Sequence, residues 1–298
     1  MSEGKTAVGV VGLGLIGTSL AKRLLAARFE VHGYDVNPAR GEALAGLGGT
    51  AEASLADLGA RCKTILIAVL STDQVESVIE GEGDGGPMHL SPAHTIICTS
   101  TCDPDRIAAL ARRVPARFLE VPLSGNSDQI ALGNGLGLVG GDSDVAQAVA
   151  PVLDAICPRR HHVGAVGAGG RTKLAVNLVG GLNRAVMAEG LAFAESLGLD
   201  LLPFLEVLKE SAAYSRTMDN RGRKMALSDF TPHAKITQSK KDFMLMRDAA
   251  ERSGQELPLA KIYLELIEGC LTHGEGDLDN SAIIQEVRRR RKPGTDPH

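Results

Sequence analysis

Near its amino end the chain carries the stretch Gly12-Leu13-Gly14-Leu15-Ile16-Gly17. It follows a continuous apolar run, Ala7 to Val11, and precedes a helical pattern from Thr18 to Ala27. An unbroken apolar run is typical of a strand buried on both faces of a parallel sheet. In a Gly-x-Gly-x-x-Gly turn between such a strand and a helix, the first glycine turns tightly, the second lets a pyrophosphate approach and the third packs helix on strand. The context therefore predicts a dinucleotide site.

A second predicted strand, Glu30 to Tyr34, ends in an acidic residue. Asp35 stands 23 positions after Gly12, close to the spacing of the acid that holds the adenosine ribose in such sites. Because a carboxylate accepts from both ribose hydroxyls and repels a 2′-phosphate, we predict NAD rather than NADP as the cofactor. A second glycine cluster, Gly133 to Gly137, opens no helix and is predicted to be a turn between strands.

Alternating strand and helix patterns extend from Thr6 to about Val163, which predicts a doubly wound parallel sheet. After Gly164–Gly170 only helical periods remain, so we place an NAD-binding Rossmann domain at 1–163 and an all-helical domain at 164–298. The second begins with a long helix predicted from Arg171 to Leu197. Gly180 and Gly181 inside it suggest close packing against another backbone.

Composition excludes several classes of protein. The 298 residues carry a net charge of −4 and nine aromatic residues without Trp, which argues against nucleic acid as a partner. No run reaches the roughly 18 apolar residues of a membrane span. Four glycines interrupt the apolar stretch within Met1 to Leu25, so it is not a secretory signal. Five scattered cysteines give neither a disulfide framework nor a metal site, and we expect a cytoplasmic protein. The basic tail Arg288–Lys292 is predicted to be a solvated end.

Two groups of residues could carry chemistry. Lys173 and Asn177 lie four apart on one face of the long helix, just after the glycine-rich hinge. A lysine beside a dinucleotide can have its pKa lowered toward neutrality, which suits proton transfer, although an exposed lysine is an equal alternative. Ser124, Gly125 and Asn126 follow a predicted strand, where a hydroxyl and backbone N–H groups could bind a carboxylate. A plain turn is the simpler reading of these three.

Five ordered motifs make the chain resemble the β-hydroxyacid dehydrogenase family, which contains 3-hydroxyisobutyrate dehydrogenase and tartronate semialdehyde reductase. Besides the glycine motif they are Val69-Leu70-Ser71, Ser100-Thr101-Cys102-Asp103-Pro104, Gly167-x-Gly-x-x-x-Lys173-x-x-x-Asn177 and Lys241-Asp242. The segment Gly276–Ala282 also resembles the terminal motif of that family. The likeness spans nearly the whole chain.

The resemblance implies a Rossmann domain and a helical domain joined by one long helix, usually in a homodimer or homotetramer. It also implies Lys173 as general acid/base, Asn177 beside it, and Ser124 and Gly125 on the substrate carboxylate. Residues implied at the cofactor are Leu70, Ser71, Thr101 and Lys241 together with Gly12, Leu13, Gly14, Leu15, Ile16, Gly17 and Asp35; no metal is implied.

The chain departs from the family pattern at two positions. Asn126 stands where the family has a second glycine, which puts a side chain where the substrate should lie. Ser71 replaces a proline, and we expect this to loosen a cofactor loop. Both changes leave the reaction class intact and put the substrate in doubt.

The leading hypothesis is NAD-linked interconversion of a small 3-hydroxy acid and its semialdehyde or keto acid. Imine reduction is one alternative, against which Lys173 argues. A decarboxylating 6-phosphogluconate enzyme needs a longer helical domain than 298 residues allow. A non-catalytic dinucleotide-binding scaffold is a third alternative. The sequence does not identify the acid.

Overall fold

The computed structural model describes residues 6–81 and 86–291. The chain divides into two compact units that meet inside helix α9 (Ala168–Ser196), between Leu174 and Ala175. The boundary inferred from sequence at residue 163 coincides with the end of strand β9, whereas the first turns of α9 pack with the first unit.

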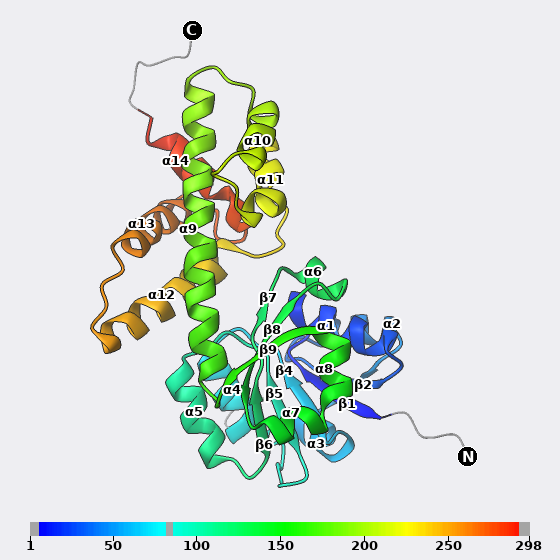
Figure 1. Cartoon of the computed structure of the whole chain (residues 1–298). Coiled ribbons are helices and arrows are strands. Elements are labelled where there is room, and N and C mark those ends of the chain that lie inside the picture. Colours follow the sequence, from blue (N-terminus) through cyan, green and yellow to red (C-terminus); the bar gives the residue numbers. More distant parts are fainter. Residues whose placement is uncertain (1–5, 82–85, 292–298) are drawn as a thin grey trace. The chain divides into compact units, whose positions relative to one another are not determined.

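The first unit is built on a nine-stranded sheet in the order β3-β2-β1-β4-β5-β6-β8-β7, with β9 paired to β8 (Figure 1). The strands from β3 to β6 in this order are parallel, so the predicted doubly wound sheet is confirmed. β8 is antiparallel to β6, and β7 is antiparallel to β8. The strands are β1 (Ala7–Val11), β2 (Glu30–Tyr34), β3 (Thr50–Ala51), β4 (Thr64–Ile67), β5 (Thr95–Cys98), β6 (Arg117–Glu120), β7 (Leu123–Ser124), β8 (Leu136–Gly141) and β9 (Arg159–Gly164).

Helices cover both faces of this sheet, which explains the unbroken apolar runs of its central strands. In β1, Val8 and Val10 join the core beneath α1 and α8, whereas Val11 joins the core beneath α3, α4 and α5. Side chains of a strand alternate between faces, so both faces of β1 need apolar residues. The helices of this unit before α9 are α1 (Leu15–Ala26), α2 (Pro38–Gly46), α3 (Leu55–Arg61), α4 (Thr72–Glu80), α5 (Pro104–Arg113), α6 (Ser127–Ala131), α7 (Ser143–Ala148) and α8 (Ala150–Ile156).

The second unit is helical, as the sequence predicted. Among its described residues the one β pairing is an isolated bridge between Lys235 and Asp279. The helices after α9 are α10 (Leu201–Glu210), the π-helical turn η1 (Met218–Gly222), α11 (Arg223–Leu227), α12 (Ile236–Ser253), α13 (Pro258–Thr272), the 3-10 turn η2 (Asn280–Ala282) and α14 (Ile283–Arg289). No helix in the described part of the chain is both long and apolar enough to span a membrane.

Details of the long helix correct three expectations. α9 starts at Ala168, before the predicted Arg171, because the backbone is already helical within the glycine-rich stretch. Gly181 packs against the aromatic ring of Phe243, where a Cβ would lie 2.5 Å from ring carbons, and not against a backbone. Gly180 faces open space.

Two further expectations about local structure are wrong. Gly133 to Gly137 joins helix α6 to strand β8 and does not join two strands, because residues 127–131 form a helix too short to give a period. In the basic tail, Arg288 pairs with Glu195 and Arg289 pairs with Glu275, so these guanidinium groups are not simply solvated. Lys292 lies outside the described residues.

Candidate active site

The three glycines of the first loop differ in what surrounds them. Gly12 has a φ of +86°, and a Cβ there would lie 2.7 Å from the carbonyl oxygen of Ala68. A Cβ on Gly17 would lie 1.8 Å from the carbonyl oxygen of Gly12, so helix α1 packs directly on the turn. Around Gly14 nothing lies within 4 Å of the same position. The loop therefore has a strained turn, a close contact and, between them, open space.

That open space lies at the amino end of α1. Gly14 is the N-cap residue, and no side chain caps the helix. The first turn also contains no acidic residue, so its N–H groups and the positive end of the helix dipole are available to an anion. These features fit the pyrophosphate of a dinucleotide.

Asp35 connects the glycine loop to the end of β2. Its Oδ2 accepts the N–H of Leu13 at 2.7 Å, and Oδ1 accepts the N–H of Asn37 at 2.9 Å. The guanidinium of Arg40 also lies against the carboxylate, 3.1 Å from Oδ2. The Asp35 side chain is only 2% exposed and the Arg40 side chain 50%. The carboxylate is thus held by two backbone N–H groups and by Arg40, a residue that sequence analysis did not select.

Two neighbouring loops join at the carboxyl ends of β4 and β5. Ser100 donates to the carbonyl of Val69 at 2.7 Å, and the N–H of Asp103 donates to Thr72 at 2.9 Å. These bonds hold Leu70 and Ser71 in one loop close to the loop that contains Thr101. Carboxyl ends of parallel strands are where open α/β sheets bind ligands.

Ser71, where we expect a looser loop, takes part in a capping box. The Ser71 hydroxyl accepts the N–H of Gln74 at 3.2 Å, and the Gln74 side chain accepts the N–H of Ser71 and of Leu70. This capping box anchors the start of α4.

The Lys173 side chain is buried beside strand β7. It is 6% exposed, and its Nζ donates a hydrogen bond to the carbonyl oxygen of Leu123 at 2.7 Å. Leu123 precedes Ser124 in β7, so the amine lies beside the segment predicted to bind a carboxylate. The exposed-lysine alternative is thereby excluded. Gly125 follows with a φ of +152°, which favours glycine at that position.

Asn126 has a defined local role. It is the N-cap of α6, where its side chain accepts the N–H of Gln129 at 2.8 Å and its own N–H donates to the Gln129 side chain at 3.0 Å. An asparagine at this position therefore stabilises the helix that follows the loop. Its contact with substrate remains a prediction.

In the second unit, Asn177 lies one helical turn beyond Lys173 on α9 and is held by α12. Its Nδ2 donates to Oδ2 of Asp242 at 3.1 Å, and the Lys241 ammonium lies 3.0 Å from Oδ1 of the same carboxylate. Asp242 therefore orients the Asn177 amide and also lies against Lys241. The Lys-Asp motif was visible in the sequence, but this role of its acid was not.

The terminal motif Gly276–Ala282 is structural. Asp279 is fully buried and accepts the N–H groups of His233 and Ala234, while Arg221 lies 3.5 Å away. Asn280 accepts from Arg221 and donates to Ser239 of α12. The motif thus ties α12 to the π-helical turn η1.

Sequence analysis also missed Glu120, the last residue of β6, which is 1% exposed. Its Oε2 accepts the N–H of Gly167 at 2.8 Å. Burial raises the pKa of this carboxyl, partly offset by the nearby N–H groups of Gly167, Gly169 and Gly170 and by the charge of Arg171. The available signal was an acidic residue between the apolar residues Leu119 and Val121.

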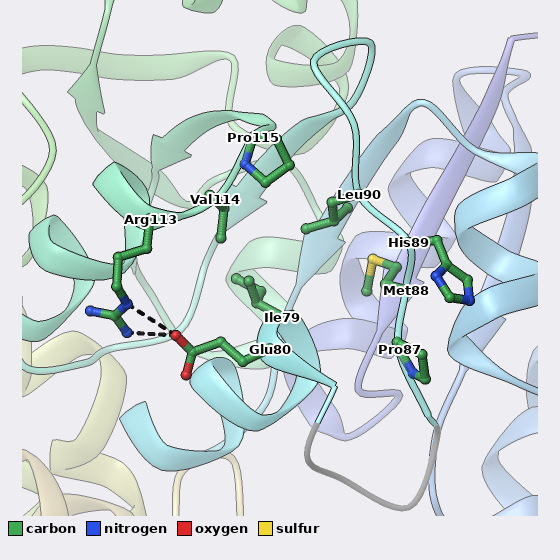
Figure 2. Close-up of a pocket in the computed structure, with 9 residues that line it drawn as sticks. All are labelled: Ile79, Glu80, Pro87, Met88, His89, Leu90, Arg113, Val114 and Pro115. Carbon is green, nitrogen blue, oxygen red and sulfur yellow. Dashed lines mark hydrogen bonds and ion pairs between the residues drawn. The ribbon is translucent and has the colours of Figure 1, made fainter.

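The nine residues drawn in Figure 2 line a pocket whose volume is about 400 Å³. It is bounded by the ends of α4 and α5 and by the segment Pro87–Leu90, with Arg113 paired to Glu80 at 2.7 Å. Since the carboxyl ends of α4 and α5 lead to the amino ends of the strands that follow them, β5 and β6, the pocket is at the amino edge of the sheet. Ligands of such sheets bind at the opposite edge. The described residues contain no cluster of His, Cys, Asp or Glu that could hold a metal ion.

The chain is similar to known proteins over nearly its whole length. Residues 7–164 match the NAD-binding domain of 6-phosphogluconate dehydrogenase, and residues 167–287 match the NAD-binding domain of NADP-dependent 3-hydroxyisobutyrate dehydrogenase. The chain is 32% identical to L-threonate dehydrogenase of Cupriavidus necator, over 93% of this chain and 95% of that protein.

The chain belongs to the 3-hydroxyisobutyrate dehydrogenase family. It is 30% identical to 2-hydroxy-3-oxopropionate reductase of Escherichia coli, over 94% of this chain and 96% of that protein. A crystal structure of 3-hydroxyisobutyrate dehydrogenase from Salmonella typhimurium superposes with a TM-score of 0.83 at 27% identity, covering 94% of this chain and 99% of that one.

Membership of the family confirms the predicted activity class. The protein is an oxidoreductase that acts on CH–OH groups, interconverts a hydroxy acid and its carbonyl form, and carries nicotinamide dinucleotide-binding domains. The imine reductase and non-catalytic scaffold alternatives are not favoured.

Proposed function

We propose that this enzyme transfers a hydride between NAD and a small 3-hydroxy acid, with Lys173 as the general acid/base. The observation that carries the proposal is the buried Lys173 amine, bonded to the Leu123 carbonyl beside Ser124. A buried amine with a fixed position at the carboxyl edge of the sheet is suited to proton transfer.

In the oxidation direction, the hydroxyl proton of the substrate passes to the neutral amine of Lys173. The bound dinucleotide supplies the hydride acceptor. As the O–H bond breaks, its electron pair forms the second bond of the carbonyl. The hydrogen on the same carbon then leaves with the C–H bonding pair as hydride. Asn177, oriented by Asp242, holds the reacting oxygen, while Ser124 and the N–H of Gly125 bind the carboxylate. Reduction runs through the same groups in reverse.

Around the cofactor we assign the remaining predicted residues. The glycine loop holds the pyrophosphate, Asp35 the ribose, and Leu70, Ser71, Thr101 and Lys241 the nicotinamide half. We infer a preference for NAD over NADP because the Asp35 carboxylate opposes a 2′-phosphate.

Substrate profiling tests the proposed function. L-Threonate, 3-hydroxyisobutyrate and the reduced form of 2-hydroxy-3-oxopropionate are offered with NAD and with NADP, since relatives are named for these acids. Saturable formation of reduced dinucleotide with at least one acid is expected. If the purified protein binds NAD but turns over none of these or related acids, the proposal fails.

The partner we propose is a second copy of this chain. Exposed apolar residues on α9 recur at a heptad spacing, at Val179, Val186 and Phe193, which are 60%, 69% and 64% exposed. Val176 and Leu197 extend the stripe to both ends. A sustained heptad stripe is typical of helix pairing, and the same stripe on a second copy matches it by symmetry.

The oligomeric state is measured by light scattering after gel filtration. We expect a homodimer or homotetramer, and Val186→Glu should dissociate it because two carboxylates would meet in the interface. A monomeric parent protein at micromolar concentration would reject the proposal. We further place the enzyme in the cytoplasm, in keeping with its five free, buried cysteines.

A further inference from the structure

Glu120 places a carboxylate against the start of the helix that carries Lys173. It ends strand β6, and its Oε2 accepts the N–H of Gly167 at 2.8 Å, just before α9 begins. The first turn of a helix has N–H groups without partners inside the helix, and its dipole favours a negative charge there. Glu120 supplies that charge from within the protein.

Glycines make room for this carboxylate on three sides. A Cβ on Gly170 would lie 2.5 Å from Oε1 of Glu120, and a Cβ on Gly169 would lie 3.1 Å from Oε2. On the neighbouring strand β8, a Cβ on Gly140 would lie 3.3 Å from Oε2. Any larger residue at Gly170 would push the acid out of its place. The glycine-rich stretch before Lys173 therefore accommodates Glu120 as well as forming a hinge.

The contact and the catalytic amine share one helical face. Gly169 and Gly170 lie four and three residues before Lys173, so all three project to the same side of α9. On the facing segment, the Glu120 carboxylate and the Leu123 carbonyl are three residues apart. One accepts from the start of the helix and the other from the Lys173 ammonium. Two anchors thus join the same two segments.

We propose that Glu120 is the positioning residue for Lys173, holding the first turn of α9 so that the amine stays at the Leu123 carbonyl. The inference rests on the role proposed for Lys173. Because displacement of a reacting group by about 1 Å can cost on the order of 100-fold in rate, this anchor bears directly on turnover.

The test compares Glu120→Gln with a matched control. Glutamine keeps the size of the side chain and one acceptor oxygen but removes the negative charge at the start of α9, so the anchor is weakened. We expect kcat to fall roughly 10- to 100-fold, with the KM for NAD changed less than about twofold. Asp105→Asn is the control, because Asp105 pairs with Arg171 in the same turn of α9 from the surface. It should keep the parent kcat.

Two further readouts separate positioning from general destabilisation. Loss of the Leu123 acceptor disfavours the protonated amine, so the pH profile of kcat should move to lower pH in Glu120→Gln. In addition, Gly170→Ala should lower kcat with Glu120 intact, and the double variant should be no slower than the slower single variant. A parent-like pH profile, or fully additive losses, would overturn the proposal.

The outcomes also separate this inference from the proposed function. If Lys173→Met is inactive while Glu120→Gln retains the parent kcat, the positioning role is rejected and the function of Lys173 stands. If Lys173→Met retains parent turnover, the proposed function itself fails.

Discussion

The ammonium group of Lys173 donates a hydrogen bond to the backbone carbonyl of Leu123, 2.7 Å away, in the short strand β7. This contact buries a lysine beside Ser124, at the edge of the sheet where parallel strands present ligands. A buried lysine is rare unless its charge is compensated or its proton is used. We therefore expect replacement of Lys173 to impair turnover.

Lys173→Met should reduce turnover by about 10²- to 10⁴-fold, the range that general acid/base groups contribute. Binding of NADH, measured by the fluorescence of its reduced nicotinamide, should remain. Lys173→Arg tests whether charge alone suffices, since arginine keeps the charge but does not release its proton. Lys240→Met is the control, because Lys240 on α12 pairs with Glu268. Parent turnover in the Lys173 variants would remove the residue from the mechanism.

The ion pair between Asp35 and Arg40 predicts how the enzyme distinguishes cofactors. Asp35→Asn keeps an acceptor for the N–H of Leu13 but removes the charge that opposes a 2′-phosphate and pairs with Arg40. The ratio of kcat/KM for NADP to that for NAD should rise roughly 10-fold or more, since a hydrogen bond to a charged group contributes about 1.5–3 kcal/mol.

The additional change Arg40→Gln should remove that gain, because the freed guanidinium is the group expected to bind the phosphate. Steady-state kinetics with both cofactors measures the effect. An unchanged ratio in Asp35→Asn would mean that Asp35 does not contact the ribose.

Replacing Gly14 by alanine should weaken dinucleotide binding, whereas replacing Gly17 by alanine should destabilise the fold. Gly14→Ala places a methyl group in open space, so the thermal midpoint should be unchanged while dinucleotide affinity falls. Gly17→Ala would place it 1.8 Å from the Gly12 carbonyl oxygen, and we expect a loss of about 1–3 kcal/mol in unfolding free energy. Calorimetry with and without NAD separates the two. Full NAD affinity in Gly14→Ala would place the pyrophosphate elsewhere.

Asn126→Gly should change the preferred acid while leaving the fold nearly intact. Glycine at an N-cap costs only roughly a few tenths of a kcal/mol relative to asparagine, so α6 survives the loss of its side-chain cap. The relative kcat/KM values for L-threonate and 3-hydroxyisobutyrate report the change. Identical substrate profiles would place Asn126 outside the pocket and leave it only its capping role.

Glu120 should also make stability depend on pH. Burial raises the pKa of this carboxyl from its ordinary value of 4.5, against the charge of Arg171 and the backbone N–H groups. The folded chain then binds more protons than the unfolded chain above pH 4.5, so this stabilising contribution is lost as pH rises through the folded pKa.

Denaturant titrations at a series of pH values above 4.5 measure the free energy of unfolding. This free energy should fall more steeply with rising pH for the parent protein than for Glu120→Gln. Cys98, the neighbouring thiol on β5, has a raised pKa caused first by its contact with Cys102 and titrates outside this window. Superimposable pH profiles for parent and variant would contradict the raised pKa of Glu120.

The sequence alone determined the class of sheet, the glycine loop, the acid after β2 and the helical second unit. These features follow from local rules: apolar runs for strands buried on both faces, glycines at a fixed turn, and helical periodicity. The structure shows Gly12 at a positive φ. It also shows Gly17 against the Gly12 carbonyl, a contact between residues close in the chain.

Contacts between distant segments needed the tertiary structure. The Lys173 amine meets a carbonyl 50 residues away, and Glu120 reaches a backbone N–H 47 residues away. Strand β7 has two residues and α6 has five, too few for periodicity to reveal, yet together they frame Ser124. Burial and hydrogen-bond partners depend on how strands are ordered in the sheet, which residue patterns along one chain do not specify.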